Sequence, residues 1–523
     1  MKNKKLLMVL FSAMLISCGR STNGSLNSSS EPSTNPSVGT SSSSESASVS
    51  TDISTSTTPS KKLVYDATLP EVKDDEFEFL EKNYEDFPTN LTETSGLTYE
   101  LSEDETYYTV SGQKSFYSDI LVIPSFHNGL PVKEIVSDAF AEKARLKEVY
   151  IPETIEKFGA GVFNGTPLLE KIYYNAKNVK DLDGKNWAFL PVSNATNEID
   201  VYFGPSVEKI PNRLFYPLST DPDRIPNIKN IYFAKESKLK SIGEYAFYKS
   251  SNAIIHDLPD TIETIGNYAF YEGKTENIDL PTSLKSIGQF AFAFNEDLKH
   301  VNFHENLENV ESNAFYNCSE LVKADLSSTI IQNLGDSSFR NCKNLKKVEF
   351  PQSLKVVDNR AFQNSSIEVL DLPDNLETIG ENAFKDCLSL KAIKLNEKLK
   401  NINKNAFSGA INVNKLVVYS SSLSDFVGGN NIFAKLGQNT DGVEVIFMET
   451  VKVIPQRMFF PNANEDLDPN IKRVVLLKTI EEIRDYAFFE LNVGKFDYEG
   501  SQEQLNNVEI GNNVFENIEC YNN

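Results

Sequence analysis

Residues 345–384 read LKKVEFPQSLKVVDNRAFQNSSIEVLDLPDNLETIGENAF and contain two copies of one pattern. The pattern is L-x-x-I-x-L-P-x-x-L-x-x-I-G-x-x-A-F, and its copies end at Phe362 and Phe384. The alternation in I-x-L indicates a short strand with two side chains turned inward, and the Pro that follows ends the ladder of that strand. Because the small Ala leaves space beside it, we expect the Phe to fill the centre of a coil, where its burial contributes roughly 1.5 to 3 kcal/mol.

The same Phe recurs every 22–24 residues through the middle of the chain and at wider intervals outside it. The sixteen positions are Phe140, Phe163, Phe189, Phe215, Phe247, Phe270, Phe292, Phe315, Phe339, Phe362, Phe384, Phe407, Phe433, Phe459, Phe488 and Phe515. A period in this range is typical of a solenoid, in which stacked coils bury a face that one coil cannot cover. The sequence therefore predicts about sixteen coils with a parallel β-sheet on one face and turns, short return strands and short helical segments on the other. In such an architecture function lies on an extended surface.

Two blocks of wide coils resemble each other. The sequence RLFYP at 213–217 is echoed by RMFFP at 457–461, and PNIK occurs at both 226–229 and 469–472. We expect a duplicated block that carries a Pro- and Asp-rich loop insertion in each copy, at 216–225 and at 460–468. Such loops either carry recognition or are tolerated insertions.

The N-terminal region has three segments of different composition. Residues 1–17 combine lysines with an apolar run that is too short to span a bilayer, as in a secretory signal peptide. The sequence LISC at 15–18 resembles the bacterial lipobox, which implies cleavage before Cys18 and lipidation of its thiol; an ordinary signal peptide is the alternative. Residues 18–62 are rich in Ser and Thr and predict a flexible tether. The N-terminal lipid would be the only membrane attachment.

Residues 63–96 are acidic and aromatic and precede the array. We expect them either to pack as a cap or to extend the tether, with 71–87 as a candidate helix. A capping coil follows at 97–140, and the repeat array occupies 141–523.

Charge and motifs narrow the functional classes. The formal net charge of −23 argues against nucleic acid as a partner, since nothing would neutralise the phosphates. The four histidines and the acidic residues form no metal, nucleophile or phosphate-loop motif, so we expect neither a cofactor nor enzymatic activity. The one catalytic alternative is hydrolysis in the wide coils, which requires acids to converge near Asp181, Asp183 or Asp441. His256 falls on a core position, where a local bulge or a satisfied imidazole is expected.

Three cysteines follow a coil Phe by three residues. Cys318, Cys342 and Cys387 therefore face the core, and we favour reduced thiols over a disulfide between the first two. Cys520 lies outside the register.

The central residue of each I-x-L strand points away from the core, and these positions form a candidate binding face. They comprise a tyrosine ladder of Tyr150, Tyr173, Tyr202 and Tyr232; an acidic zone that includes Asp257, Asp279, Asp325, Glu349 and Asp371; and then Lys394, Val417, Ile446 and Val475. The tyrosines either contribute to a partner site or stabilise the sheet by cross-strand pairing. The acidic zone is either a solvated surface that neighbouring lysines neutralise or a strip that attracts a basic partner or weakly holds Ca²⁺.

The repeat, together with YYTVSG at 107–112 and ILVIPSFHNGLPVKEI at 120–135, resembles the BspA-like leucine-rich repeat family of bacterial surface proteins. The resemblance covers about 97–519 and is weakest in the wide coils at 187–216 and 417–460. It implies a leucine-rich repeat solenoid, display on the cell surface, and adhesion to or binding of an extracellular protein or cell-surface ligand on host cells, matrix or other bacteria. A non-adhesive scaffold in the envelope is the alternative. The sequence is compatible with a monomer but does not fix the oligomeric state.

Overall fold

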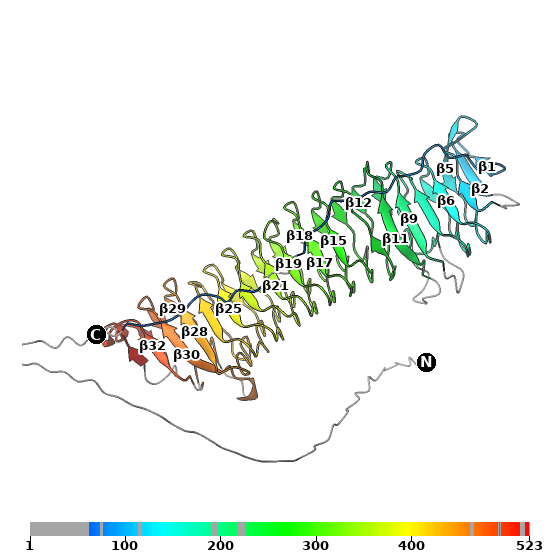
Figure 1. The fold of residues 1–523 in the computed structure, drawn as a ribbon. Coiled ribbons are helices and arrows are strands. Elements are labelled where there is room, and N and C mark those ends of the chain that lie inside the picture. Colours follow the sequence, from blue (N-terminus) through cyan, green and yellow to red (C-terminus); the bar gives the residue numbers. More distant parts are fainter. Residues whose placement is uncertain are drawn as a thin grey trace, which may run out of the picture. The chain divides into compact units, whose positions relative to one another are not determined.

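The computed structural model describes residues 62–521 except 74–76, 113–117, 190–196, 218–224, 461–464, 490, 492 and 513–517. This part of the chain is a right-to-left stack of coils in Figure 1, from the cap at β1 and β2 to β32 near the C-terminus. Cys18, the predicted signal peptide and nearly all of the predicted tether lie outside the described residues. The predicted solenoid with a parallel sheet is confirmed.

The first strand of each coil contributes to one face of the stack, which we call the main sheet; its strands pair in parallel in four successive ladders, with breaks after Ile254–Ile255, His300–Asn302 and Lys347–Glu349. These strands are β3 (Ile120–Val122), β6 (Glu148–Ile151), β8 (Lys171–Tyr174), β9 (Ile199–Phe203), β11 (Ile228–Phe233), β13 (Ile254–Ile255), β15 (Asn277–Asp279), β17 (His300–Asn302), β19 (Lys323–Asp325), β21 (Lys347–Glu349), β23 (Val369–Asp371), β25 (Ala392–Leu395), β27 (Lys415–Val418), β28 (Val443–Phe447), β30 (Ile471–Leu476), β32 (Phe496–Tyr498) and β34 (Ile518–Cys520).

The return legs of most coils form a second set of two-residue strands paired in parallel, and each strand except the last has one inward apolar side chain; both residues of the last strand, Glu509–Ile510, are exposed. Its strands are β7 (Lys157–Phe158), β10 (Lys209–Ile210), β12 (Ser241–Ile242), β14 (Thr264–Ile265), β16 (Ser286–Ile287), β18 (Asn309–Val310), β20 (Asn333–Leu334), β22 (Val356–Val357), β24 (Thr378–Ile379), β26 (Asn401–Ile402), β29 (Val453–Ile454), β31 (Glu482–Ile483) and β33 (Glu509–Ile510). Helix is scarce: the described residues hold one short α-helix, α1 (Gln502–Leu505), and one 3₁₀ turn, η2 (Glu465–Leu467). Turns fill the positions where short helical segments were expected.

The cap closes the first coil. Strand β1 (Thr98–Leu101) pairs antiparallel with β2 (Tyr108–Gly112), which pairs in parallel with β5 (Leu130–Ile135). Strand β4 (Phe126–His127) forms a hairpin with β5. Since β7 pairs with β5 in turn, the return ladder starts directly from the cap.

The coil phenylalanines form one unbroken column through the interior. Fifteen of the sixteen lie in the described residues, all buried, and successive ring centroids from Phe140 to Phe488 are 4.9 to 5.9 Å apart. The backbone supports the column, because the Phe362 N–H donates to the Ala383 carbonyl of the next coil at 2.8 Å and most other coils repeat this bond. The predicted role of the Phe is confirmed; Phe515 lies outside the described residues.

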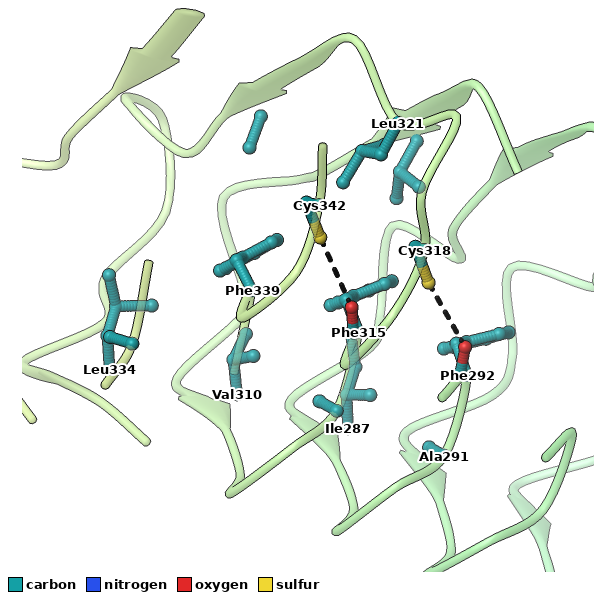
Figure 2. Close-up of a cluster of buried hydrophobic side chains, with 14 of the residues drawn as sticks. Ile287, Ala291, Phe292, Val310, Phe315, Cys318, Leu321, Leu334, Phe339 and Cys342 are labelled. Atoms are coloured by element: carbon teal, nitrogen blue, oxygen red, sulfur yellow. Dashed lines mark hydrogen bonds between the residues drawn. The ribbon is translucent and has the colours of Figure 1, made fainter. Parts of the chain in front are cut away.

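In four coils the side chain three residues after the Phe, Asn295, Cys318, Cys342 or Cys387, donates to the buried Phe carbonyl of the preceding coil. The thiols of Cys318 and Cys342 donate to the carbonyls of Phe292 and Phe315 at 3.2 and 3.3 Å, as Figure 2 shows. Both thiols are fully buried and free, so the expected reduced state is confirmed. Burial raises the pKa of the Cys387 thiol, which occupies the same position, to about 12.

The wide coils continue the stack with one register shift in each block, between Ile228 and Asn230 and between Val443 and Glu444. Their main-sheet strands are longer, five residues in β9 and β28 and six in β11 and β30. The ring column crosses them without a gap, at 4.9 Å between Phe189 and Phe215 and 5.1 Å between Phe433 and Phe459. The resemblance to the family is thus weaker in these coils because they are longer, and not because the coil is of another type. Most of the first predicted loop insertion, 218–224, and part of the second, 461–464, lie outside the described residues.

Candidate binding face

The outward side chains of the main sheet form a continuous strip, which we call the outer face. The four predicted tyrosines lie together in it, since Tyr150, Tyr173, Tyr202 and Tyr232 stack at centroid distances of 4.3, 4.7 and 4.8 Å. Burial raises the pKa of each of these phenols. Tyr173 is only 8% exposed, so this part of the ladder is not open to solvent.

His256 extends the tyrosine ladder and does not enter the core. Its ring stacks on Tyr232 at 4.5 Å and its Nε2 lies 2.9 Å from Asn230 Oδ1. The chain returns to register through Asp257, whose φ of 35° is a left-handed conformation that a non-Gly residue seldom adopts. Of the two expectations for His256, the local irregularity is correct and the core imidazole is wrong. Burial lowers the pKa of this imidazole.

The acidic zone is neutralised by lysines. Lys323 lies 3.3 Å from Asp325 and 3.2 Å from Glu349, Lys347 lies 2.9 Å from Glu349, and Lys394 lies 2.9 Å from Asp371. Each of these three carboxylates therefore faces a lysine, either within its own strand or on a neighbouring one. In the part of the chain that the structure describes, no group of three or more His, Cys, Asp or Glu side chains is placed to hold a metal ion.

Residues 62–73 and 77–96 lie along the outer face, and we call them the strap. In Figure 1 it is the dark blue trace that follows the array from the C-terminal coils to the cap. The candidate helix at 71–87 is wrong for the described residues, which are extended or irregular. The physical reason is that 77–87 bonds to the array, since Lys82 reaches the Leu258 carbonyl and Asp260 and the Asn83 amide reaches Asp257. Before it, from 62 to 70, buried or half-buried residues alternate strictly with exposed ones, as in a strand.

The first part of the strap fills an apolar patch at the C-terminal end of the outer face. Leu63 is 7% exposed and joins a buried cluster, and Tyr65, Ala67 and Leu69 pack against the same cluster. We define the apolar patch as the array residues of this cluster, which are Val417, Ile446, Met448, Val475, Leu477 and Tyr521. The outward-facing apolar residues noted in the sequence, Val417, Ile446 and Val475, are thus explained by the segment that covers them.

Two cations hold this part of the strap. Lys415 Nζ donates to Asp66 Oδ2 at 2.9 Å and to the Thr68 carbonyl at 2.7 Å, and the Arg473 guanidinium donates to the Val64 carbonyl at 2.9 Å. Hydrogen bonds from Thr68 and then from Lys415 hold the pKa of the Asp66 carboxyl well below its usual range.

Arg473 is itself fixed by acids. Its Nε lies 2.6 Å from Asp497, whose side chain is fully buried, and its NH1 lies 2.6 Å from Glu444. Lys495 also contacts Asp497, at 2.8 Å. This network places the guanidinium at the edge of the apolar patch.

The middle of the strap crosses the acidic zone. Lys82 Nζ lies 2.8 Å from Asp260 and 3.6 Å from Asp279, and it donates to the Leu258 carbonyl at 3.0 Å. The Asn83 amide donates to Asp257 Oδ2 at 2.9 Å. The basic side chain that meets the acidic zone therefore belongs to the chain itself.

Aromatic contacts secure the strap on either side of Lys82. Phe77 stacks on His300 with centroids 3.9 Å apart, and Phe87 meets Tyr173 edge-on at 5.9 Å. At the cap end the Thr94 amide donates to the Val122 carbonyl at 3.0 Å.

Two cavities lie between the strap and the sheet. One of about 530 Å³ is lined by Leu69 to Val72 of the strap and by residues of β21, β23 and β25, including Glu349, Asp371 and Lys394. The other, of about 220 Å³, lies beneath Phe87 to Leu91 and reaches Tyr150 and Tyr173. The strap therefore bridges parts of the outer face that it does not fill.

The acids of the hydrolytic alternative do not converge. Asp181 pairs with Lys209 at 2.6 Å and Asp441 pairs with Lys472 at 3.2 Å, in coils far apart along the array. Asp183 accepts a hydrogen bond from the Lys185 amide. Cys520, for which the sequence offered no role, is partly buried in β34 with its sulfur 3.6 Å from Gln502 Oε1.

Comparison with solved structures finds leucine-rich repeat proteins of bacteria. A leucine-rich repeat protein from Bacteroides ovatus shares 20% identity, with 80% of this chain and 90% of that chain covered and a TM-score of 0.45. A leucine rich cell surface protein from Faecalibacterium prausnitzii shares 16% identity over 81% of this chain and 98% of that one, with a TM-score of 0.32. The pneumococcal vaccine antigen PcpA shares 19% identity over 82% and 98%, with a TM-score of 0.36.

No curated protein sequence matches the chain. Among the described residues no helix is long and apolar enough to cross a bilayer. The family model described as "BspA type Leucine rich repeat region (6 copies)" matches residues 109–231, 223–332, 326–439 and 438–522, which together exceed half of the sequence. The chain therefore belongs to the BspA type leucine-rich repeat family.

Proposed function

We propose that this leucine-rich repeat protein of the interaction type is displayed on the bacterial cell surface, anchored through lipid on Cys18, and mediates adhesion to host cells, matrix or other bacteria. The observation that carries the proposal is the outer face, where successive short strands along the array turn tyrosines, acids, lysines and apolar residues outward and where the strap bridges cavities that it does not fill. Stacked coils offer breadth of surface, and that is the means by which solenoids bind large partners.

The composition of the outer face suits protein recognition. Stacked tyrosines supply rigid amphipathic area, and such residues are enriched at the energetic centres of interfaces. Paired charges beside them give orientation and specificity more than affinity. The proposed site comprises Tyr150, Tyr173, Tyr202, Tyr232, Asp257, Asp279, Asp325, Glu349 and Asp371.

A test of the function compares bacteria that lack the protein with bacteria that express either the wild-type chain or Cys18→Ala. We expect loss of adhesion to immobilised matrix proteins and host cells on deletion, restoration by the wild type, and no restoration by Cys18→Ala, which should be released into the medium. Ser21→Ala, in the same segment but outside the lipobox, is the matched control and should restore adhesion. Unchanged adhesion with altered envelope integrity on deletion would contradict the proposal and favour the scaffold alternative.

A further inference from the structure

The apolar patch would be an exposed interaction surface if nothing covered it. Val417, Ile446 and Val475 are fully buried although they point out of the main sheet, and Leu63 with the alternate residues after it is what buries them. Contiguous apolar surface on a soluble protein marks a site of interaction when it is open. The strap thus occupies a surface that has the character of a binding site.

The strap lies on this surface as a ligand lies on a receptor. Within residues 62–73 the hydrogen bonds that join it to the array come from two side chains, those of Lys415 and Arg473, and not from a sheet ladder. Two residues of extended chain advance about 6.6 Å, a little more than the spacing of about 4.8 Å between strands. Every second side chain therefore meets a further strand of the array, while Val64, in between, remains 75% exposed.

We propose that the apolar patch, with Lys415 and Arg473 beside it, is a binding site for an extended polypeptide segment of a partner protein that carries apolar side chains at alternate positions and an acidic residue among them. Residues 62–73 occupy this site in the resting protein. The patch recognises the alternation, Lys415 receives the acid, and Arg473 holds a main-chain carbonyl. This inference deepens the proposed function, on which it rests, by assigning a partner class to one end of the outer face.

The test uses the full chain and a fluorescent peptide with the sequence of residues 62–73, KLVYDATLPEVK. In the variant Leu63→Asp/Leu69→Asp the resident segment loses its apolar contacts while the patch remains intact. Fluorescence anisotropy should show the peptide binding this variant at least 10-fold more tightly than it binds the wild type. Val64→Asp changes an exposed residue of the same segment and should behave as the wild type does.

Two further measurements make the result decisive. Trypsin should cleave after Lys62 and Lys73 faster in the double variant, with the melting of the array unchanged by circular dichroism. A peptide of the same composition in which Leu, Tyr, Ala and Leu are shifted to the positions of Lys62, Val64, Asp66 and Thr68 should not bind. Equal affinity of KLVYDATLPEVK for all three proteins, equal binding of the shifted peptide, or unchanged cleavage of the double variant would each overturn the inference. Because the titration involves no cells, its failure is distinguishable from failure of adhesion.

Discussion

The inner and the outer side of the main sheet follow different rules. On the inner side each strand presents the same apolar residues to the same ring column, because each coil meets a copy of itself above and below. On the outer side the corresponding residues change from Tyr to Asp to Val along the array, and each change matches what lies on top: Phe87 on Tyr173, Lys82 at Asp279, Leu63 in the cluster of Val475. The inner side is thus set by the repeat, whereas the outer side is set by the segment that covers it.

The largest effect should come from the inner side. Replacing Phe362 with Ala leaves a cavity between two stacked rings, each 5.2–5.5 Å from its neighbours in this stretch, and should cost about 3–5 kcal/mol. Since coils of an array unfold with their neighbours, hydrogen exchange should accelerate from about β20 to β24 before the ends respond. Phe126→Ala, at a ring that is 57% exposed, is the control and should change stability by less than about 1 kcal/mol. A loss of the same small size at Phe362 would contradict the role of the ring column.

The second effect tests the charged edge of the apolar patch. Arg473→Met removes one partner of the fully buried Asp497, and breaking such a pair costs about 3–5 kcal/mol. We expect less, about 2–3 kcal/mol, because Lys495 and Tyr521 still contact the carboxylate. Urea unfolding of the C-terminal coils, followed by hydrogen exchange, measures it.

The control for this variant is Arg484→Met. Its partners Asp425 and Glu482 are 42% and 31% exposed, so the loss should not exceed about 1 kcal/mol. If both substitutions cost the same, the Asp497 network does not stabilise the patch.

The contacts on the outer side of the main sheet could largely not be predicted from the sequence, and the reason is physical. The coils, the Phe column, the tyrosine ladder and the core thiols followed from periodicity, since each depends on contacts between identical positions of adjacent coils. The path of residues 62–96 depends on contacts between residues that are far apart in the sequence, 176 positions for the contact of Lys82 and 349 for that of Lys415. The repeat pattern does not indicate such contacts. The sequence nevertheless contained an indication of this contact. Apolar residues alternate at Leu63, Tyr65, Ala67 and Leu69, and apolar residues point outward at the C-terminal end of the array; these two sets pack against each other.

His256 and the candidate helix show how pattern reasoning failed locally. The template placed His256 inward, but a stacking partner in Tyr232 and a left-handed Asp257 turn it outward. The acidic and aromatic residues of 71–87 suit a helix surface, yet Phe77 and Lys82 find better partners on the array than one helical turn could offer.

A smaller effect, the pH dependence of strap attachment, should distinguish the outer side of the main sheet from the inner side. Burial of Asp260 alone would raise its pKa, but hydrogen bonds from Lys82 and from the Thr282 amide more than offset this, so the pKa lies below its ordinary value of 3.8. A carboxyl with a lowered folded pKa contributes stability that is complete above its unfolded pKa and is lost as the pH falls through the folded value. Attachment of the strap should therefore weaken below about pH 4, whereas the apolar ring column should not respond directly.

The measurement is hydrogen exchange of residues 77–90 across pH 2.5–6, corrected for intrinsic rates. Asp260→Asn should flatten the pH dependence, and Asp374→Asn, at an exposed residue, should not. Equal pH dependence in both variants would contradict the role of Lys82.

The smallest effect is expected at the core thiols. Cys342→Ser should change stability by less than about 1 kcal/mol, because the hydroxyl can donate to the Phe315 carbonyl as the thiol does, and the chain itself uses Ser365 at this position. Thermal denaturation measures this change in stability. Cys342→Leu overfills the site and leaves the Phe315 carbonyl unpaired, so it should lower the stability more than Cys342→Ser does. If Ser proves as costly as Leu, the thiol has a role beyond this hydrogen bond.

The most direct test of the account is zero-length carbodiimide cross-linking of the intact chain at low concentration, read by mass spectrometry. Lys82 with Asp260 and Lys415 with Asp66 lie at 2.8 and 2.9 Å, so both pairs should join within one molecule, as should the control pair Lys400 with Glu377 at 2.8 Å inside the array. Recovery of the control cross-link without either of the other two would contradict the claim that residues 62–96 cover the outer face.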